Sequence, residues 1–312
     1  MNKQLVIALG GNALGSTPEE QKQSVLAAAG HIVNLAKDGY KIVIVHGNGP
    51  QVGLINLAFE TGYAQNEKIS LMPFAECCAM SQGYIGYHLQ NALQNTFAQE
   101  GMSTHVSTAI TQVIVDPADP AFQNPTKPVG LFYSEETARQ IEAERGYTFV
   151  EDSGRGFRRV VPSPEPVDIK EKGTIRCLME NGDIVIACGG GGIPVYRDGD
   201  MLRGVDAVID KDKAASRLAD VIEADTFIVL TAVPKVAINF GKPDQKWLEY
   251  VSIAEMEQYI KEGHFAPGSM LPKVEAALRF IKAGKGRKAI ITSLDNAYHA
   301  VTKENCTVIY GE

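Results

Sequence analysis

The stretch KIVIVHGNGPQVG, residues 41–53, joins a short apolar run directly to a glycine-rich turn. Residues 42–45 are four consecutive β-branched aliphatic residues without polar alternation. This pattern is typical of a strand covered on both faces, as in a parallel sheet. Four further apolar runs are of the same kind: LVIAL (5–9), DIVIAC (183–188), TFIVL (226–230) and KAIIT (288–292).

Segments with helical periodicity alternate with these strands. Residues 17–20, Thr-Pro-Glu-Glu, form a capping box with proline at the first helical position, and Gly39 ends the helix that follows. The apolar stripe of this helix is Val25, Ala28, Ala29, Ile32, Leu35 and Ala36. Further helices are expected over about 74–99, despite Gly83 and Gly86, and over 270–283. The alternation predicts an α/β fold around a mostly parallel sheet.

Residues 116–166 interrupt this alternation. They are polar and rich in proline, with one short helix expected over 135–144 behind the capping residue Ser134. A segment of this length inside a compact domain is either functional or a small subdomain of its own. We interpret it as an excursion from the sheet edge that folds over a site as a lid.

Composition and charge exclude several classes of protein. The chain has 312 residues, 45% of them hydrophobic, and a net charge of −7 without long runs of one sign. This argues against electrostatic binding to nucleic acid or to an anionic membrane. No apolar run approaches the ~20 residues of a membrane span. The five cysteines form no CxxC pair, so we expect buried, reduced thiols in a cytoplasmic protein.

Three glycine-rich turns follow strands: GGNALG (10–15), HGNGPQVG (46–53) and CGGGGIP (188–194). Glycine lets the backbone adopt φ > 0 and approach a phosphate without a Cβ in the way. Ligands of open α/β sheets bind at the carboxyl ends of strands, so the turns predict an anion site, although tight turns alone would use the same residues. Neither a P-loop nor an in-register G-x-G-x-x-G is present, which leaves a phosphate binder of another kind.

Two lysines lie at expected helix starts, where a cation is disfavoured by the helix dipole. Lys211 follows the N-cap candidate Asp210, and Lys273 follows Ser269, another N-cap candidate, with Pro272 in the first turn. A solvated lysine that extends away from the helix explains either one alone. Two at matching positions indicate an anion that both lysines bind, as phosphoryl transfer requires.

Asp212 and Lys127 complete the set of candidates. Asp212 can hold the lysine head groups, help to place Mg²⁺, or simply complement the helix dipole. Lys127 lies between Pro125 and Pro128, which restrict the backbone and suit a side chain that reaches over an anionic substrate. A lysine of a surface loop is the alternative. The six histidines show no metal-ligand spacing, and we expect no metal site built from protein ligands alone.

Seven stretches together resemble carbamate kinase, of the amino acid kinase superfamily, over nearly the whole chain. They are ALGGNAL (8–14), HGNGPQVG (46–53), DPAFQNPTKPVG (119–130), EDSGRGFRRVVPSPEPVDI (151–169), CGGGGIPV (188–195), AVIDKD (207–212) and GHFAPGSMLPKVEAA (263–277). The resemblance implies one kinase domain over 1–312, a three-layer αβα sandwich with about eight mostly parallel strands. It also implies a protruding subdomain over 113–166, inserted in that domain, and a homodimer.

The resemblance also implies a reaction and the residues that perform it. MgATP and carbamate would be in equilibrium with MgADP and carbamoyl phosphate, so Mg²⁺ enters with the nucleotide. Lys211 and Lys273 would contact the transferring phosphoryl group, Asp212 would organise them, and Lys127 would reach carbamoyl phosphate. Donors around the substrate would be Gly10, Gly11, Asn12, Asn48, Gly49 and Gly191. The nucleotide would be bordered by Thr231, Ala232, Val233, Asn239, Gly268, Ser269 and Met270.

Three other functions remain open at this point. Another acylphosphate-forming amino acid kinase would need a partner for the ammonium group of its substrate. A nicotinamide-dependent oxidoreductase is disfavoured because no in-register G-x-G-x-x-G is present. A non-catalytic sensor of phosphorylated metabolites is disfavoured by the retained lysines.

Overall fold

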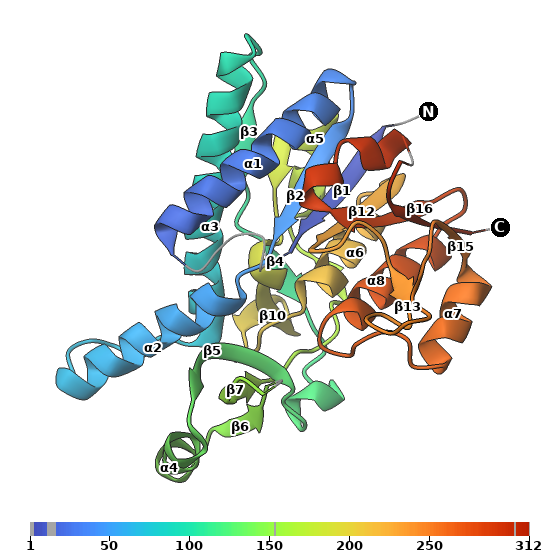
Figure 1. Ribbon diagram of the computed structural model, residues 1–312. Helices are drawn as coiled ribbons and strands as arrows, with labels where there is room; N and C mark the ends of the chain where they lie inside the picture. The colour runs from blue at the N-terminus through green and yellow to red at the C-terminus, as the bar shows by residue number, and fades with distance from the viewer. Residues whose placement is uncertain (1–2, 11–16, 153, 303, 312) are drawn as a thin grey trace.

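A computed structural model describes residues 3–10, 17–152, 154–302 and 304–311 and is built around an eight-stranded sheet (Figure 1). Its order is β15-β17-β16-β12-β1-β2-β9-β3, and only β16 and β17 pair antiparallel. The strands are β1 (Gln4–Leu9), β2 (Lys41–His46), β3 (Val106–Thr108), β9 (Ile184–Ile186), β12 (Thr226–Thr231), β15 (Tyr250–Ser252), β16 (Lys288–Ser293) and β17 (Thr307–Tyr310). The expected sheet of about eight mostly parallel strands is confirmed.

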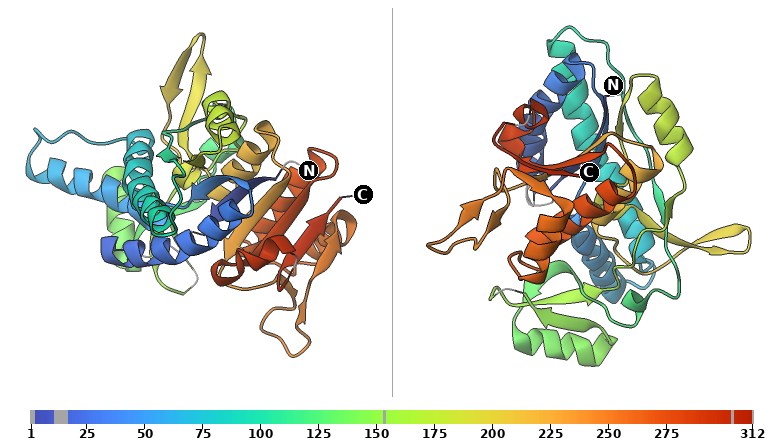
Figure 2. Two further views of the ribbon diagram at one scale, coloured as in Figure 1. Left: turned by 90° about the horizontal axis from the view of Figure 1, so that it is seen from above. Right: turned by 90° about the vertical axis from the view of Figure 1, so that its right-hand side faces the viewer.

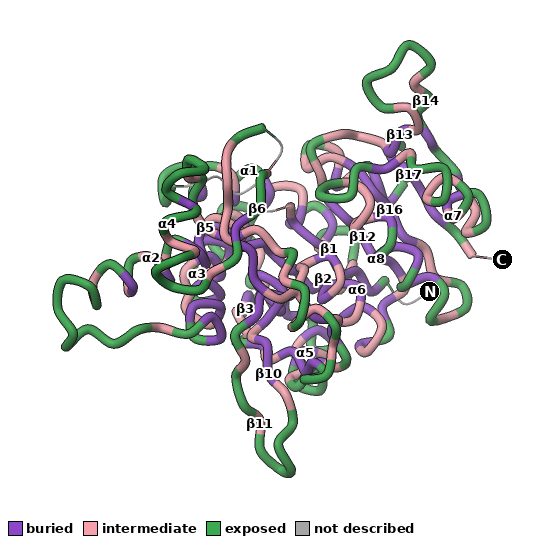
Figure 3. Tube along the Cα trace, turned by 90° about the horizontal axis from the view of Figure 1, so that it is seen from below, coloured by how far each residue is buried: buried purple, intermediate pink, exposed green. Residues whose placement is uncertain are grey.

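Helices cover both faces of this sheet (Figure 2). On β1, Leu5, Ile7 and Leu9 belong to the core under α1 (Pro18–Lys37) and α3 (Phe74–Gln99), whereas Val6 and Ala8 belong to the opposite core. That second core is covered by α5 (Lys172–Glu180), α6 (Lys211–Val221), α7 (Ile253–Lys261) and α8 (Met270–Lys282). Successive side chains of each strand thus enter opposite cores, which gives three αβα layers. The buried strands lie between the two helical layers (Figure 3).

The sequence signals for the first helices are confirmed. In α1 the Thr17 side chain accepts from the Glu20 amide and the Glu20 side chain accepts from the Thr17 amide, and Gly39 beyond its end has φ 79°. Helix α3 runs unbroken from 74 to 99. A Cβ on Gly86 would lie 2.4 Å from Cγ2 of Thr108, so this glycine permits a close approach of α3 to β3.

Residues 116–166 form more regular structure than their sequence predicts. Three antiparallel strands, β5 (Lys127–Tyr133), β7 (Phe157–Val161) and β6 (Thr148–Glu151), make a small sheet beside α4 (Glu135–Arg145), whose N-cap is Ser134 as expected. This unit lies against α2 (Gly49–Gln65), a helix that the sequence analysis did not identify (Figure 1). The 3₁₀ turn η2 (Pro120–Phe122) precedes it.

The remaining elements are short. A four-stranded sheet contains β4 (Gln112–Ile114), β8 (Asp168–Ile169), β10 (Ile193–Asp198) and β11 (Met201–Gly204). A two-stranded ribbon contains β13 (Ala237–Ile238) and β14 (Lys246–Trp247). Three further 3₁₀ turns are η3 (Gly189–Gly191), η4 (Leu294–Asn296) and η5 (His299–Thr302).

The thiols follow the sequence expectation with one exception. Four of the five cysteines are buried, but Cys177 is exposed on α5, so the prediction of buried thiols is wrong at this position. Cys177 lies on the half of α5 that faces away from the sheet, whereas Ile175 and Met179 enter the core. Among the described residues, no helix has the length and apolar character needed to cross a membrane.

Candidate active site

The turns after β2 and β9 pack directly against each other and against the start of α6. A Cβ on Gly190 would lie 2.0 Å from Nδ2 of Asn48, and one on Gly191 would lie 2.2 Å from the carbonyl oxygen of Ile209. Both glycines have positive φ, 69° and 97°. Glycine is therefore required at these two positions both for the backbone conformation and for the close packing. The expected convergence of these turns at one edge of the sheet is observed.

Helix α6 begins at the lysine that the sequence singled out. Asp210 is the N-cap, and its Oδ1 accepts hydrogen bonds from the amides of Asp212 (2.9 Å) and Lys213 (3.3 Å). Lys211 occupies the first helical position, and its Nζ donates to Oδ1 of Asp212 at 2.5 Å. The capping carboxylate fixes the backbone, and the next carboxylate fixes the ammonium group.

Lys273 comes from α8 and meets the same carboxylate. Its Nζ lies 3.3 Å from Oδ2 of Asp212 and donates to the carbonyl oxygen of Ser269 at 3.1 Å. Ser269 is at the N-cap position, as predicted, but its side chain makes no capping hydrogen bond. Asp212 is 3% exposed, so a single buried carboxylate holds two lysines from different helices. This geometry is the one expected of a residue that organises the pair.

Lys127 reaches the same place from the small sheet. It is the first residue of β5, not part of a free loop, and its Nζ lies 2.6 Å from Oδ2 of Asp210. The alternative of a solvated surface lysine is therefore wrong: its side chain is 28% exposed and paired. The structure brings together all four residues predicted to be catalytic: Lys127, Lys211, Asp212 and Lys273.

Three ammonium groups and two carboxylates meet at the start of α6, which leaves one positive charge in excess. Burial alone would raise the pKa of Asp210, but Lys127 and then Lys211 hold this pKa well below its ordinary value. Asp210 thus stays ionised in spite of its burial. The surplus charge and the helix N-terminus together suit a phosphorylated ligand.

Asp210 is the functional candidate that the sequence analysis missed, because it was interpreted only as a helix cap. One of its oxygens caps α6, and the other binds Lys127. The sequence did contain a signal for this double role. A carboxylate directly before a helix that begins with a lysine can both cap the helix and bind a lysine side chain. The sequence could not show that Asp210 pairs with Lys127, because the two residues are 83 positions apart.

The expected substrate-binding residues have different surroundings. Gly10 follows β1, and a Cβ there would lie 3.0 Å from the carbonyl oxygen of Leu230. Gly49 is the first residue of α2 and has open space where a Cβ would be. Asn48 is buried, and its Nδ2 donates to Oγ of Ser81 at 2.9 Å. Gly11 and Asn12 lie outside the described residues.

The expected nucleotide-binding residues lie on two segments. Thr231 ends β12, with Ala232 and Val233 in the turn behind it, and Gly268, Ser269 and Met270 form the start of α8. Asn239 adopts φ 53° just after β13, and its Nδ2 donates to Oδ2 of Asp244 at 2.6 Å. The elements that carry the two segments, β12 and α8, are neighbours in the structure.

The residues present do not form a cage for Mg²⁺. In the described part of the chain, no three His, Cys, Asp or Glu side chains gather as metal ligands. Both oxygens of Asp212 are bound to lysines, and both oxygens of Asp210 have partners. A Mg²⁺ ion here would depend on phosphate oxygens and water, as it commonly does.

Fold and site together define a class of protein: an open α/β kinase-like domain whose lysine cluster lies beside the turns that follow parallel strands. The model of the amino acid kinase family matches residues 3–293. The carbamate kinase-like protein YqeA of Escherichia coli strain K12 is 52% identical over 309 residues, 99% of both chains. The carbamate kinase of Clostridium perfringens is 51% identical, covering 98% of this chain and 99% of that one.

A solved structure agrees with these relatives. Carbamate kinase from Giardia lamblia bound to AMP-PNP superposes with a TM-score of 0.91 at 44% identity, covering 99% of each chain. The chain therefore belongs to the amino acid kinase family and, within it, to the carbamate kinase group.

Proposed function

We propose that the protein is a carbamate kinase, which transfers a phosphoryl group reversibly between MgATP and carbamate to give MgADP and carbamoyl phosphate. The observation that supports this most directly is the convergence of Lys127, Lys211 and Lys273 on two aspartates at the start of α6. Relatives of similar length, about half identical to this chain, carry the name carbamate kinase.

The mechanism follows from the charges. The nucleophile is an oxygen of carbamate, which is already anionic, so no general base is required and transfer occurs directly in line. Lys211 and Lys273 neutralise the transferring phosphoryl group, and Asp212 holds their ammonium groups in place before the substrate arrives. Lys127 leaves or shares Asp210 to bind the carbamoyl phosphate oxygens. Mg²⁺ that arrives with the nucleotide would supply charge neutralisation on the nucleotide phosphates.

The test is ATP synthesis from MgADP and carbamoyl phosphate. We expect ATP to form at millimolar substrate and formation to stop when EDTA removes Mg²⁺. Acetyl phosphate, glutamate with ATP, and aspartate with ATP serve as controls for other acylphosphate kinases. Folded protein that makes no ATP from carbamoyl phosphate would overturn the proposal, and turnover of an amino acid instead would assign a sister activity.

Residues 113–166 are proposed to act as the lid over this site. The support is that β5 of this segment supplies Lys127, while most of the segment is exposed or half-buried. Amide hydrogen exchange in β5, β6 and β7 should slow on adding carbamoyl phosphate. Equal exchange with and without ligand, at the level of the central strands, would contradict the lid.

The remaining assignments come with the family. We propose that the protein is a homodimer in the cytoplasm. The homodimer is what the resemblance to carbamate kinase implies. Light scattering behind size exclusion measures the mass directly, and a monomer at micromolar concentration would contradict the homodimer.

A further inference from the structure

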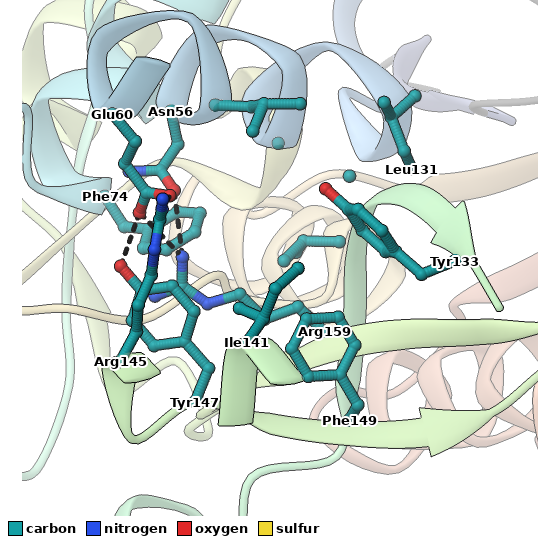
Figure 4. Close-up of a pocket in the computed structure, with 14 residues that line it drawn as sticks. Asn56, Glu60, Phe74, Leu131, Tyr133, Ile141, Arg145, Tyr147, Phe149 and Arg159 are labelled. Carbon is teal, nitrogen blue, oxygen red and sulfur yellow. Dashed lines mark hydrogen bonds and ion pairs between the residues drawn. The ribbon is translucent and has the colours of Figure 1, made fainter. Parts of the chain in front are cut away.

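A buried carboxylate on α2 holds the small sheet that carries Lys127. Glu60 accepts from Nη1 of Arg145 (2.8 Å), from the hydroxyl of Tyr147 (2.5 Å) and from Nη1 of Arg159 (3.1 Å). All three donors belong to the segment from α4 to β7, and Glu60 belongs to α2 (Figure 4). We call these four residues the Glu60 junction.

Arg159 is fixed more tightly than a surface arginine. The same Nη1 atom also donates to Oδ1 of Asn56 on α2 at 3.0 Å. The guanidinium group lies 3.4 Å from the ring centre of Tyr147 and 5.0 Å from that of Phe74. Such a planar group between aromatic faces, with carboxylate and amide acceptors at its edge, has one preferred position. Arg159 belongs to the stretch EDSGRGFRRVVPSPEPVDI (151–169), one of the seven that carry the family resemblance.

The backbones of the two parts touch beside this junction. A Cβ on Gly53 of α2 would lie 2.1 Å from the amide nitrogen of Gly130 on β5. The three nearest atoms are all backbone atoms of Val129 and Gly130, so no side-chain rotation could make room. A cavity of about 140 Å³ lies next to this contact, lined among others by Leu57, Val129 and Tyr133 (Figure 4). The cavity is not at the lysines, so it does not belong to the active site.

The Glu60 junction is connected to the active site along two routes, one through α2 and one through the strands of the lid. It begins at Gly49, beside Asn48 of the substrate turn, and Glu60 lies three turns further along. On the other side, Arg159 is the register partner of Val129, and Lys127 is only two residues before Val129 on the same strand. The Glu60 junction is therefore linked to Asn48 through α2 and to Lys127 through the pairing of β7 with β5.

From this geometry we infer that Glu60 is a positioning residue for the reaction: it docks the lid on α2 and thereby places Lys127 for carbamoyl phosphate. The partners of Glu60 are the three lid residues of the Glu60 junction, and none of them is a lysine of the active site. The inference rests on the proposed function, because it assigns to Glu60 an effect on the substrate that Lys127 binds. It also predicts a local structural effect that does not depend on activity.

The kinetic test compares Glu60→Ala, Lys127→Ala and the double variant. Glu60→Ala should raise KM for carbamoyl phosphate about five- to tenfold, because a misplaced group loses its contact with the substrate. KM for ADP should stay within about twofold. If Glu60 acts through Lys127, the double variant should have the KM of Lys127→Ala alone. Unchanged KM in Glu60→Ala, or fully additive effects in the double variant, would overturn the inference.

Two matched control variants test whether the change in KM comes from lost docking of the lid. One removes a different carboxylate, and the other replaces a different glycine. Glu135→Ala removes a carboxylate on the exposed side of α4 that pairs only with Arg139, and it should behave as wild type. Gly53→Ala should raise KM for carbamoyl phosphate like Glu60→Ala, whereas Gly30→Ala, at a helical position with open space, should not. A Gly53→Ala enzyme with wild-type KM would contradict the docking geometry.

Hydrogen exchange gives the readout that is independent of turnover. In Glu60→Ala and in the milder Glu60→Gln, amides of β5 and β7 should exchange at least about tenfold faster, while those of β1 and β2 should not change. If the wild-type enzyme makes no ATP, the proposed function fails, and this experiment still decides whether Glu60 docks the lid. Unaltered exchange in both variants would show that it does not.

Discussion

The start of α6 and the Glu60 junction are both clusters of cations around carboxylates, yet they are built from different residues. At α6 the cations are lysines, each with one or two partners, on three separate elements. At the junction they are arginines, and Arg159 combines hydrogen bonds with contacts to two aromatic rings. Each cluster has one more positive charge than negative charge among these residues.

The difference shows that ligand binding and docking of the lid use different cations in this chain. An ammonium group is a compact charge on a flexible stem, so it can exchange a carboxylate partner for a phosphoryl oxygen. A guanidinium group is planar and offers several fixed donors, so it suits a contact that must persist. The lysine cluster is therefore suited to an incoming anion, and the arginine cluster to holding the lid on α2.

The largest effect is expected where a lysine meets the transferring group. Lys211→Ala should lower kcat by on the order of 10²–10³, because it removes charge aimed at the phosphoryl group itself. Lys273→Ala should do likewise. The melting temperature should fall only modestly in either variant, because the buried Asp212 loses one lysine but keeps the other as its partner. Steady-state kinetics and calorimetry measure the two quantities, and a Lys211→Ala enzyme with wild-type turnover would refute the anion site.

Lys127 should respond differently, because it reaches the site from the lid. Lys127→Ala should raise KM for carbamoyl phosphate roughly ten- to a hundredfold, with KM for ADP nearly unchanged and some loss of kcat. Varying one substrate at a time at saturating concentration of the other separates these constants. Equal increases of both KM values would mean that Lys127 does not distinguish the two substrates.

How much of this could be foreseen depends on sequence distance. The strands, the capping box of α1 and the lysines at two helix starts are visible because their signals lie within a few residues. The pairing of Lys127 with Asp210 and of Arg159 with Glu60 spans 83 and 99 residues, so no local pattern contains it. Helix α2 was missed because its apolar residues do not gather on one face, and among its buried residues are Gln51, Asn56 and Glu60. The strands of the lid were masked by prolines and polar residues.

Acid should lower the stability of the fold through a buried histidine, His46. His46 is the last residue of β2, its Nδ1–H donates to the carbonyl oxygen of Gly47 at 3.0 Å, and burial lowers its pKa to about 4. The unfolded chain binds a proton near pH 6.5, so stability is full above that pH and is lost as pH falls toward 4. The free energy of unfolding should be about 2 kcal/mol lower at pH 5 than at pH 7 from this group alone.

Asp210 cannot cause this loss. Its pKa is depressed in the folded state, so its contribution to stability is present above its unfolded pKa and is lost only at lower pH. Urea denaturation at pH 7 and pH 5 should therefore show a smaller pH effect in His46→Gln than in wild type. His299→Gln, at an exposed position, is the control and should keep the wild-type difference. An undiminished pH effect in His46→Gln would assign the loss to other groups.

The smallest expected effect tests the contrast between arginine and lysine most directly. Arg159→Lys keeps the positive charge beside Glu60 but replaces the planar group that lies against Tyr147 and Phe74 and also reaches Asn56. The variant should lose about 1–2 kcal/mol of unfolding free energy and show a two- to threefold higher KM for carbamoyl phosphate, because an ammonium group cannot make both contacts in one plane. Arg139→Lys, which exchanges the same residue types on the exposed face of α4, should leave both quantities unchanged. If Arg159→Lys also matches wild type in urea denaturation and in KM, charge alone holds the lid, and the planar geometry of Arg159 has no part in placing Lys127.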